Sequence, residues 1–426
     1  MHTFPKFMLI LQAKALYTMN NIAIFTLTSE LHDAQTINAA TQEFLSSLGI
    51  QYDFHDADYS NYGTAPLNII YVRTGGTEGQ FRRLLPQLTC SHASNGKSNK
   101  PGVIYLLTSG KSNSLAASLE ILSYLRQQGI RGEVIHGTPE LITRRLQLLE
   151  HAALALRQLH GCRVGVIGKP SDWLISSQAD YDAIRQRAGI DIIDIPMQEL
   201  LDEIQRTPLE DPQIEGGEPH IREALPVAHQ IYLALKTLVQ KYQLQGLTIR
   251  CFDLLTAVHN TGCLALARLN SEGLCAGCEG DVPTLLTMML SRAVTGISGF
   301  QANPAHINPE TGEMLFAHCT IPFNMVEHFE LDTHFESGIG VGIRGYQKPG
   351  PVTIFKVSGN LSRYFLAEGQ LLRCEGKPDL CRTQQVIQLN NPEQARYFLT
   401  DPIGNHHVIV PGHIGEIMTE LLNTLE

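Results

Sequence analysis

Short apolar runs alternate with amphipathic segments through the first two thirds of the chain. Runs such as 22–27 and 68–72 are apolar at nearly every position, which is typical of strands buried on both faces of a parallel sheet. Segments such as 36–48 and 114–128 place apolar residues at helical spacing, and each is followed by a glycine. The alternation predicts two doubly wound, Rossmann-like α/β domains, over residues 19–158 and 159–299.

The pattern changes after Gly299. Glycine, proline and threonine become frequent, and segments such as 352–357 and 384–389 have the length and composition of strands. We therefore predict a β-rich, barrel-like C-terminal domain over residues 300–426, which ends in a helix over 414–425. Residues 1–18 contain an apolar run that is too short and too interrupted for a signal peptide, and Met19 is an alternative start just before the first predicted strand.

Composition and charge narrow the range of partners. The chain has 426 residues, 17% of them charged, and a formal net charge of −10, which argues against a nucleic-acid partner. No run of 18 apolar residues occurs, so we expect no transmembrane helix and no membrane partner. The nine cysteines are scattered and odd in number, which favours free thiols in a reducing compartment and a cytoplasmic protein.

The stretch 274–283 combines small residues with two carboxylates directly before a predicted helix. It reads Leu-Cys-Ala-Gly-Cys-Glu-Gly-Asp-Val-Pro. A strand, a tight turn, an acid and a helix in this order place a side chain at the carboxyl edge of a parallel sheet. Glu279 and Asp281 are therefore candidate catalytic residues, although acids in a surface turn can also simply cap a helix.

Histidines in the last third of the chain supply further candidate ligands. His318 lies within an apolar run, and His406 and His407 follow Asn405 in a glycine-containing segment. A single buried histidine is more often a core residue than a ligand. Two such places together with an acidic turn predict a mixed Glu/His site for a divalent cation such as Mn²⁺.

These motifs resemble those of the L-fucose isomerase and L-arabinose isomerase superfamily. The resemblance implies that Glu279 is a metal ligand and a proton carrier, that His318 is a ligand, and that one residue of the His406–His407 pair, preferably His407, is another. It also implies a metal-dependent aldose–ketose isomerase that acts on a free pentose or deoxyhexose through a cis-enediol. Members of this superfamily form oligomers, so the resemblance implies a homo-oligomer, a trimer or a hexamer.

Position 303 departs from the pattern of this superfamily. The spacing after Phe300 places Asn303 where the fucose isomerases have a second acidic ligand. An asparagine can bind a metal through its carbonyl oxygen, but it cannot act as a base. Either another group, such as Asp281 or Glu336, replaces that acid, or the protein is a non-catalytic sugar-binding or regulatory homologue.

The sequence gives weaker evidence for the substrate-binding residues than for the metal ligands. Trp173, the only tryptophan, follows a predicted strand and is a candidate for stacking on a sugar, although packing at a domain boundary explains it equally well. Asn405 and His406 are further candidate substrate contacts. Lys169 and Arg344 could bind an anionic group, which leaves an isomerase of a modified or acidic sugar as an alternative.

Overall fold

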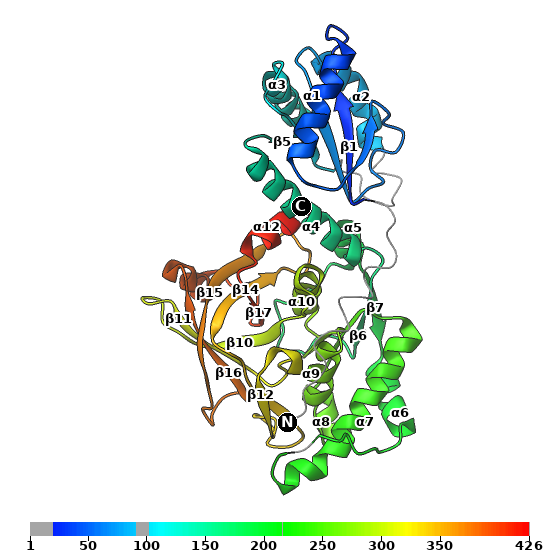
Figure 1. Ribbon diagram of the computed structural model, residues 1–426. Helices are drawn as coiled ribbons and strands as arrows, with labels where there is room; N and C mark the ends of the chain where they lie inside the picture. The colour runs from blue at the N-terminus through cyan, green and yellow to red at the C-terminus, as the bar shows by residue number, and fades with distance from the viewer. Residues whose placement is uncertain (1–19, 91–101, 215, 426) are drawn as a thin grey trace. The chain divides into compact units, whose positions relative to one another are not determined.

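The computed structural model describes residues 20–90, 102–214 and 216–425. By its internal contacts the chain divides into two compact units, residues 1–154 and 155–426 (Figure 1). The predictions for residues 1–18 concern a segment outside the described residues. The domain boundary that we predicted at residue 299 falls inside the second unit, between its parallel sheet and its barrel.

The first unit contains a five-stranded parallel sheet in the order β2-β1-β3-β4-β5. Its strands are β1 (Ile22–Leu27), β2 (Asp53–Asp56), β3 (Leu67–Val72), β4 (Ile104–Leu107) and β5 (Gly132–Ile135). The helices are α1 (Ala34–Ser47), α2 (Glu78–Cys90), α3 (Ser114–Gln127) and α4 (Pro139–Leu159), the last of which continues into the second unit. Successive residues of β1 enter different apolar clusters, Ile24 with α1 and α4 and Phe25 with α2 and α3. Helices therefore cover both faces of the sheet, as predicted.

The second unit begins with a four-stranded parallel sheet in the order β7-β6-β8-β9. Its strands are β6 (Arg163–Ile167), β7 (Asp191–Ile195), β8 (Gly246–Ile249) and β9 (Cys275–Gly277). The helices are α5 (Tyr181–Ala188), α6 (Met197–Arg206), α7 (Pro219–Tyr242), α8 (Asp253–Val258), α9 (Cys263–Ser271) and α10 (Val282–Thr295).

The rest of the second unit is a closed antiparallel barrel in the order β10-β11-β16-β15-β14-β17. Its strands are β10 (Phe300–Ile307), β11 (Glu313–His318), β14 (Gly350–Val357), β15 (Tyr364–Glu375), β16 (Thr383–Leu389) and β17 (His407–Pro411). β12 (His328–Asp332) and β13 (Gly342–Tyr346) form a separate ribbon, and α12 (Gly415–Leu425) ends the chain. The predicted fold class, α/β with a barrel-like C-terminal region, is confirmed.

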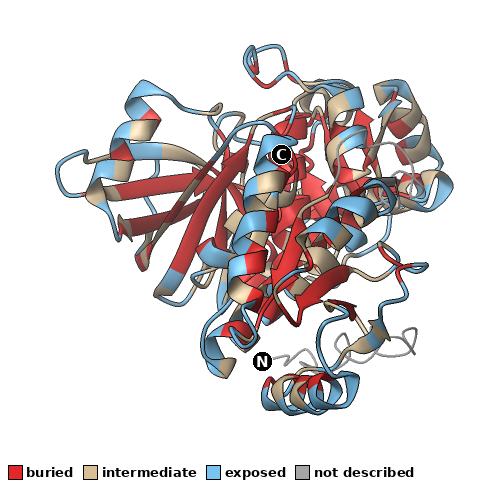
Figure 2. Cartoon of the chain, turned by 90° about the horizontal axis from the view of Figure 1, so that it is seen from above, coloured by how far each residue is buried: buried red, intermediate tan, exposed pale blue. Residues whose placement is uncertain are grey.

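Helix α10 joins the parallel sheet to the barrel. It contacts β8 and β9 as well as β14 and β17, and it is buried along most of its length. In Figure 1 it lies between the two sheets. Most strands are buried, while the outward faces of most helices are exposed (Figure 2). The residues just before α10 are therefore held where the edge of the parallel sheet meets the barrel.

Candidate metal centre

The turn between β9 and α10 places Glu279 in an unusual backbone conformation. Glu279 has φ +63° and Gly280 has φ +71°, both in the left-handed region that favours glycine. A Cβ at Gly280 would lie 2.4 Å from the Lys169 carbonyl oxygen, so only glycine fits there. The Glu279 carbonyl accepts the Ser171 N–H at 2.9 Å, and the Gly280 N–H donates to the Ile249 carbonyl at 2.8 Å. These contacts fix where the Glu279 side chain leaves the backbone.

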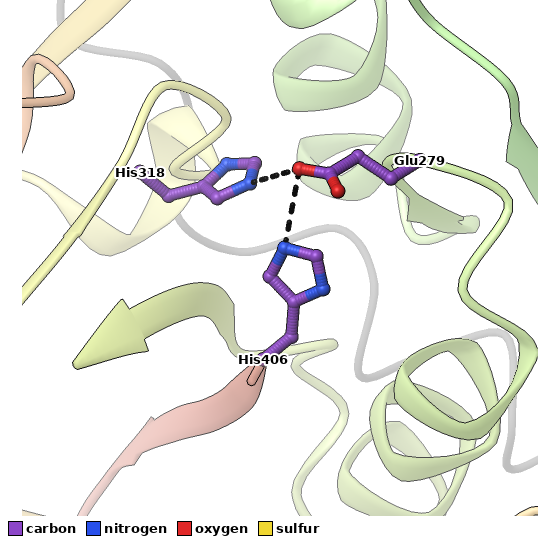
Figure 3. A group of neighbouring side chains, drawn as sticks. All are labelled: Glu279, His318 and His406. Atoms are coloured by element: carbon purple, nitrogen blue, oxygen red, sulfur yellow. Dashed lines mark ion pairs between the residues drawn. The ribbon is translucent and has the colours of Figure 1, made fainter. Parts of the chain in front are cut away.

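Three buried side chains from distant parts of the chain converge on one point (Figure 3). Glu279 Oε1 lies 3.3 Å from His406 Nε2 and 3.9 Å from His318 Nε2. His318 is the last residue of β11, and His406 directly precedes β17. One atom from each side chain lies within 4.8 Å of the others. A carboxylate oxygen and two imidazole nitrogens at this spacing form a donor set that suits a divalent cation.

Hydrogen bonds orient each of the three donors. The Nδ1 atom of His406 lies 2.9 Å from Asp281 Oδ2, and that of His318 lies 3.0 Å from Thr320 Oγ1. Both rings therefore present Nε2 to Glu279 Oε1. The Trp173 indole N–H donates to Glu279 Oε2 at 2.6 Å, which leaves Oε1 as the oxygen that faces the rings. Metal-binding histidines are held in the same way, through the ring nitrogen that does not bind the metal.

A buried lysine lies behind this cluster. Lys356 is 1% exposed, and its Nζ is 3.5 Å from Asp281 Oδ2 and hydrogen bonded to Thr284 Oγ1. Asp281 is fully buried and also accepts the backbone N–H of Thr284 at 2.8 Å, as the N-cap of α10. The Thr284 hydroxyl donates to Asp281 Oδ2 at 2.7 Å, and with His406 this carboxylate has four hydrogen-bonding or ionic contacts, so its oxygens are occupied inside the protein.

The charges in the cluster shift its pKa values strongly. Burial opposes the charged form of Glu279, but His406 more than offsets this and lowers the pKa of Glu279 to about 2. Burial likewise opposes a charged His406, but the carboxylates of Glu279 and Asp281 raise its pKa to about 9. Burial and the neighbouring His406 lower the pKa of His318 to about 4. At neutral pH the cluster without metal therefore holds one protonated histidine between two carboxylates.

Two of the buried polar atoms that lack an ordinary hydrogen bond suit a metal site. They are Oδ1 of Asn303 and Nε2 of His406, whose contact with Glu279 Oε1 is a 3.3 Å ion pair. Asn303 shares a face of β10 with Gln301, whose Oε1 accepts the Cys278 N–H at 2.8 Å. Asn303 also pairs with Ala317, the residue before His318. Since buried polar atoms are rarely left unpaired, these atoms suit a cation that completes their coordination.

The chain is similar to sulfoquinovose isomerases. It is 23% identical over 270 residues to the sulfoquinovose isomerase of Alkalicoccus urumqiensis, a match that covers 60% of this chain and 61% of the relative. It is 22% identical over 313 residues to that of Clostridium sp. (strain MSTE9), with 65% of this chain and 66% of the relative covered. The chain thus matches less than two thirds of the length of either relative. No protein-family model matches it. The similarity supports a relationship to sugar isomerases, without singling out the L-fucose or L-arabinose enzymes.

The other residues singled out from the sequence lie in different surroundings. His407, which we preferred as a ligand, points away from the cluster: its Nε2 is 3.0 Å from the Tyr397 hydroxyl, and its ring packs on Phe398. The structure brings His406 to Glu279 instead. The side chain of Asn405 is exposed, and Glu336 is exposed in the turn after β12.

Trp173 and Arg344 have contacts that the sequence did not predict. Trp173 is 49% exposed and packs edge-on against Phe252 at 4.8 Å between ring centroids, in addition to its bond to Glu279. Arg344 is paired with Asp332 at 2.8 Å.

Every helix among the described residues is too short or too polar to cross a membrane.

Lys356 was not singled out from the sequence, although a signal for it exists. It is the only charged residue in the run Val352-Thr353-Ile354-Phe355-Lys356-Val357, all of which is buried. A charged residue inside a buried strand requires a partner of opposite charge, and Asp281 is that partner.

Binding of a metal at this site is expected to release a proton. With a pKa of about 9, His406 is protonated at pH 7, and only the neutral ring can bind a metal. Calorimetric titration of metal-stripped protein with Mn²⁺ in buffers of different ionisation enthalpy should show release of about one proton per metal at pH 7. The variant His406→Gln should abolish this release and His407→Gln should keep it. Proton release that is unchanged in His406→Gln would contradict the assignment.

Proposed function

We propose that the protein is an aldose–ketose isomerase that depends on a divalent metal and acts on a modified, anionic sugar. The observation that carries the proposal is the convergence of Glu279, His318 and His406 on one point, with their donor atoms oriented by hydrogen bonds. The names of the relatives support an isomerase, and they name a sulfo-sugar as the substrate of those proteins. We propose a cytoplasmic homo-oligomer, a trimer or a hexamer, on the basis of the family resemblance alone.

Glu279, His318 and His406 would hold the metal, with the carbonyl oxygen of Asn303 as a fourth ligand. We propose Mn²⁺, which accepts this mixture of carboxylate, imidazole and carbonyl donors. The bound cation would act as a Lewis acid that stabilises negative charge developing on the sugar oxygens. The protein supplies the orientation of the donors: Trp173 holds Oε2 of Glu279 and Asp281 holds Nδ1 of His406.

Aldose–ketose isomerisation requires a group that moves a proton between C1 and C2 of the sugar. We propose that Asp281 orients His406 and does not carry this proton, because its two oxygens are occupied by His406, Thr284 and Lys356. Asn303 cannot carry the proton either, because an amide does not act as a base. Glu336 is the best candidate for the proton carrier, because its carboxylate is exposed and can therefore reach a bound sugar.

An electrostatic effect on a shared neighbour supports Glu336 as a residue near the site. A hydrogen bond with Cys319, together with burial, raises the pKa of the Cys381 thiol most, and the charges of Glu336 and Glu279 raise it further. Both carboxylates therefore lie within electrostatic range of one side chain. Glu336 also belongs to a turn that continues into Gly338, whose lack of a side chain permits close approach of a ligand to the backbone.

The anionic part of the substrate has a candidate partner in Lys169. This lysine is exposed, forms no ion pair among the described residues, and belongs to the loop that places Trp173 on Glu279. Arg344 is less suited because Asp332 already neutralises it. Lys169→Met should raise KM for an anionic sugar about tenfold, since a hydrogen bond to a charged group contributes roughly 1.5–3 kcal/mol. Steady-state kinetics should show no such change for a neutral sugar, and an equal change for both would contradict this role.

The proposed function is tested by turnover assays on metal-stripped protein with and without Mn²⁺. The substrates should include sulfoquinovose, an acidic sugar, and neutral pentoses and deoxyhexoses. Conversion of the anionic sugars that requires Mn²⁺ supports the proposal, and conversion of the neutral sugars alone would favour a free pentose or deoxyhexose as substrate. Sugar binding without any turnover would favour the non-catalytic homologue, and Asn303 is the feature of the sequence that supports that alternative.

A further inference from the structure

Five cysteines form a series of neighbouring thiols beside the metal centre. The Cys251 and Cys278 sulfurs are 2.9 Å apart, and Cys251 lies within electrostatic range of Cys263. Cys319 lies close enough to Cys263 and Cys381 for these thiols to shift one another's pKa. Four of the five are buried, and Cys381 is partly exposed. The series is directly attached to the site, because Cys278 precedes Glu279 and Cys319 follows His318.

Cys251 and Cys278 have the geometry of a pair that can be joined. They follow the adjacent parallel strands β8 and β9, which pair through Thr248 and Gly277. The two sulfurs are already closer than two non-bonded sulfur atoms normally pack, and they need to approach by less than about 1 Å to reach the S–S bond length of about 2.05 Å. Both Cys251 and Cys278 are free thiols.

We propose that Cys251 and Cys278 are a modification site, at which hydrogen peroxide converts the two thiols reversibly into a disulfide. In the first step the sulfur of Cys251, the less buried of the two, attacks one peroxide oxygen; the O–O bond breaks, a sulfenic acid forms and one water leaves. In the second step the Cys278 sulfur attacks the sulfenic sulfur; the S–S bond forms, the S–O bond breaks and a second water leaves. The two sulfurs lose two electrons to the peroxide, and both thiol protons end in water. A small dithiol reverses the change by thiol–disulfide exchange.

The disulfide is expected to disturb the metal centre, an effect that rests on the proposed function of Glu279 as a ligand. To reach Cys251, Cys278 must move. The backbone around it is fixed by two hydrogen bonds, from the Cys278 N–H to Gln301 and from the Ser171 N–H to the Glu279 carbonyl. Metal–ligand distances tolerate changes of only about 0.2 Å. A displacement of several tenths of an ångström, passed to the adjacent Glu279, should therefore weaken metal binding about tenfold or more.

The first measurement is chemical and does not depend on activity. Full-length protein is treated with hydrogen peroxide, with and without later dithiothreitol, and its free thiols are counted after denaturation. We expect two of the nine thiols to be lost and then recovered, and peptide mapping by mass spectrometry to find the Cys251–Cys278 link. A different pairing, or overoxidation without a disulfide, would overturn the proposal even if every cysteine variant failed to fold.

The variants and the metal affinity complete the test. Cys251→Ser should abolish the linked peptide, while Cys162→Ser, which removes a partly exposed thiol that contacts the Gln158 carbonyl, should leave it unchanged. Mn²⁺ affinity of the oxidised protein, followed by electron paramagnetic resonance, should fall about tenfold and recover on reduction. A disulfide that forms without any change in Mn²⁺ affinity would refute the coupling to Glu279. Absence of isomerase activity in reduced protein that binds Mn²⁺ would refute only the proposed function.

Discussion

Replacement of Glu279 by glutamine is expected to abolish metal-dependent turnover. Glutamine keeps the size of the side chain and an oxygen for the Trp173 N–H, but it carries no charge and cannot accept a proton. Loss of this ligand, and with it of the cation that stabilises the developing negative charge, should lower kcat by about 10³-fold or more. Metal analysis after dialysis should show that the variant retains much less Mn²⁺ than the native protein.

Two further carboxylates serve to interpret that result. Glu310→Gln, in an exposed turn, should leave both turnover and metal content unchanged. Glu336→Gln should lower kcat about 10²-fold or more while the metal is retained, as expected for a proton carrier that is not a ligand. Full activity in Glu336→Gln would exclude Glu336 as the proton carrier, and retention of metal and activity by Glu279→Gln would refute the proposed centre.

Replacement of Lys356 by methionine is expected to have the largest effect on stability. Methionine fills a similar volume but leaves the buried carboxylate of Asp281 without its cationic partner on that side. Removing one member of a buried ion pair typically costs about 3–5 kcal/mol. Urea unfolding of metal-free protein, followed by the fluorescence of Trp173, should show a lower midpoint and a free energy of unfolding reduced by that amount. Because Trp173 is the only tryptophan, its signal reports on the second unit.

The matched controls for Lys356 use an exposed lysine and the partner carboxylate. Lys236→Met breaks an exposed pair with Glu272 and should cost at most about 1 kcal/mol. Combining Lys356→Met with Asp281→Asn should recover part of the loss, because asparagine removes the buried charge and can still cap α10. An equal cost for Lys356→Met and Lys236→Met would show that the buried pair does not stabilise the fold.

The fold was predictable because burial leaves a clear pattern in the sequence. Strands such as β1 and β3 are buried on both faces, and the amphipathic segment that follows β1 ends at Gly49. The barrel was predictable only as a β-rich region. Its closure depends on β17 pairing with both β10 and β14, and pairing between strands so far apart in sequence is not visible in local patterns.

The histidine that approaches Glu279 was not predictable, for a geometric reason. Adjacent residues of a strand point to opposite faces, so a shift of one residue exchanges the roles of His406 and His407. The register of β17 against β10, in which Ala302 faces His407, places His407 in the barrel with Tyr397 and Phe398 and turns His406 to Glu279. Both histidines are fully buried, so burial alone could not have distinguished them.

The ribosome makes β17, which closes the barrel, only after the two strands that it joins, β10 and β14. Before residues 406–411 are synthesised, β10 and β14 each lack a neighbour, and such unpaired edges are prone to join other chains. His406 is synthesised as part of the same segment. A nascent chain therefore cannot assemble the Glu279–His318–His406 centre during most of its synthesis, and a chain that ends prematurely lacks both the closed barrel and the third side chain of the centre.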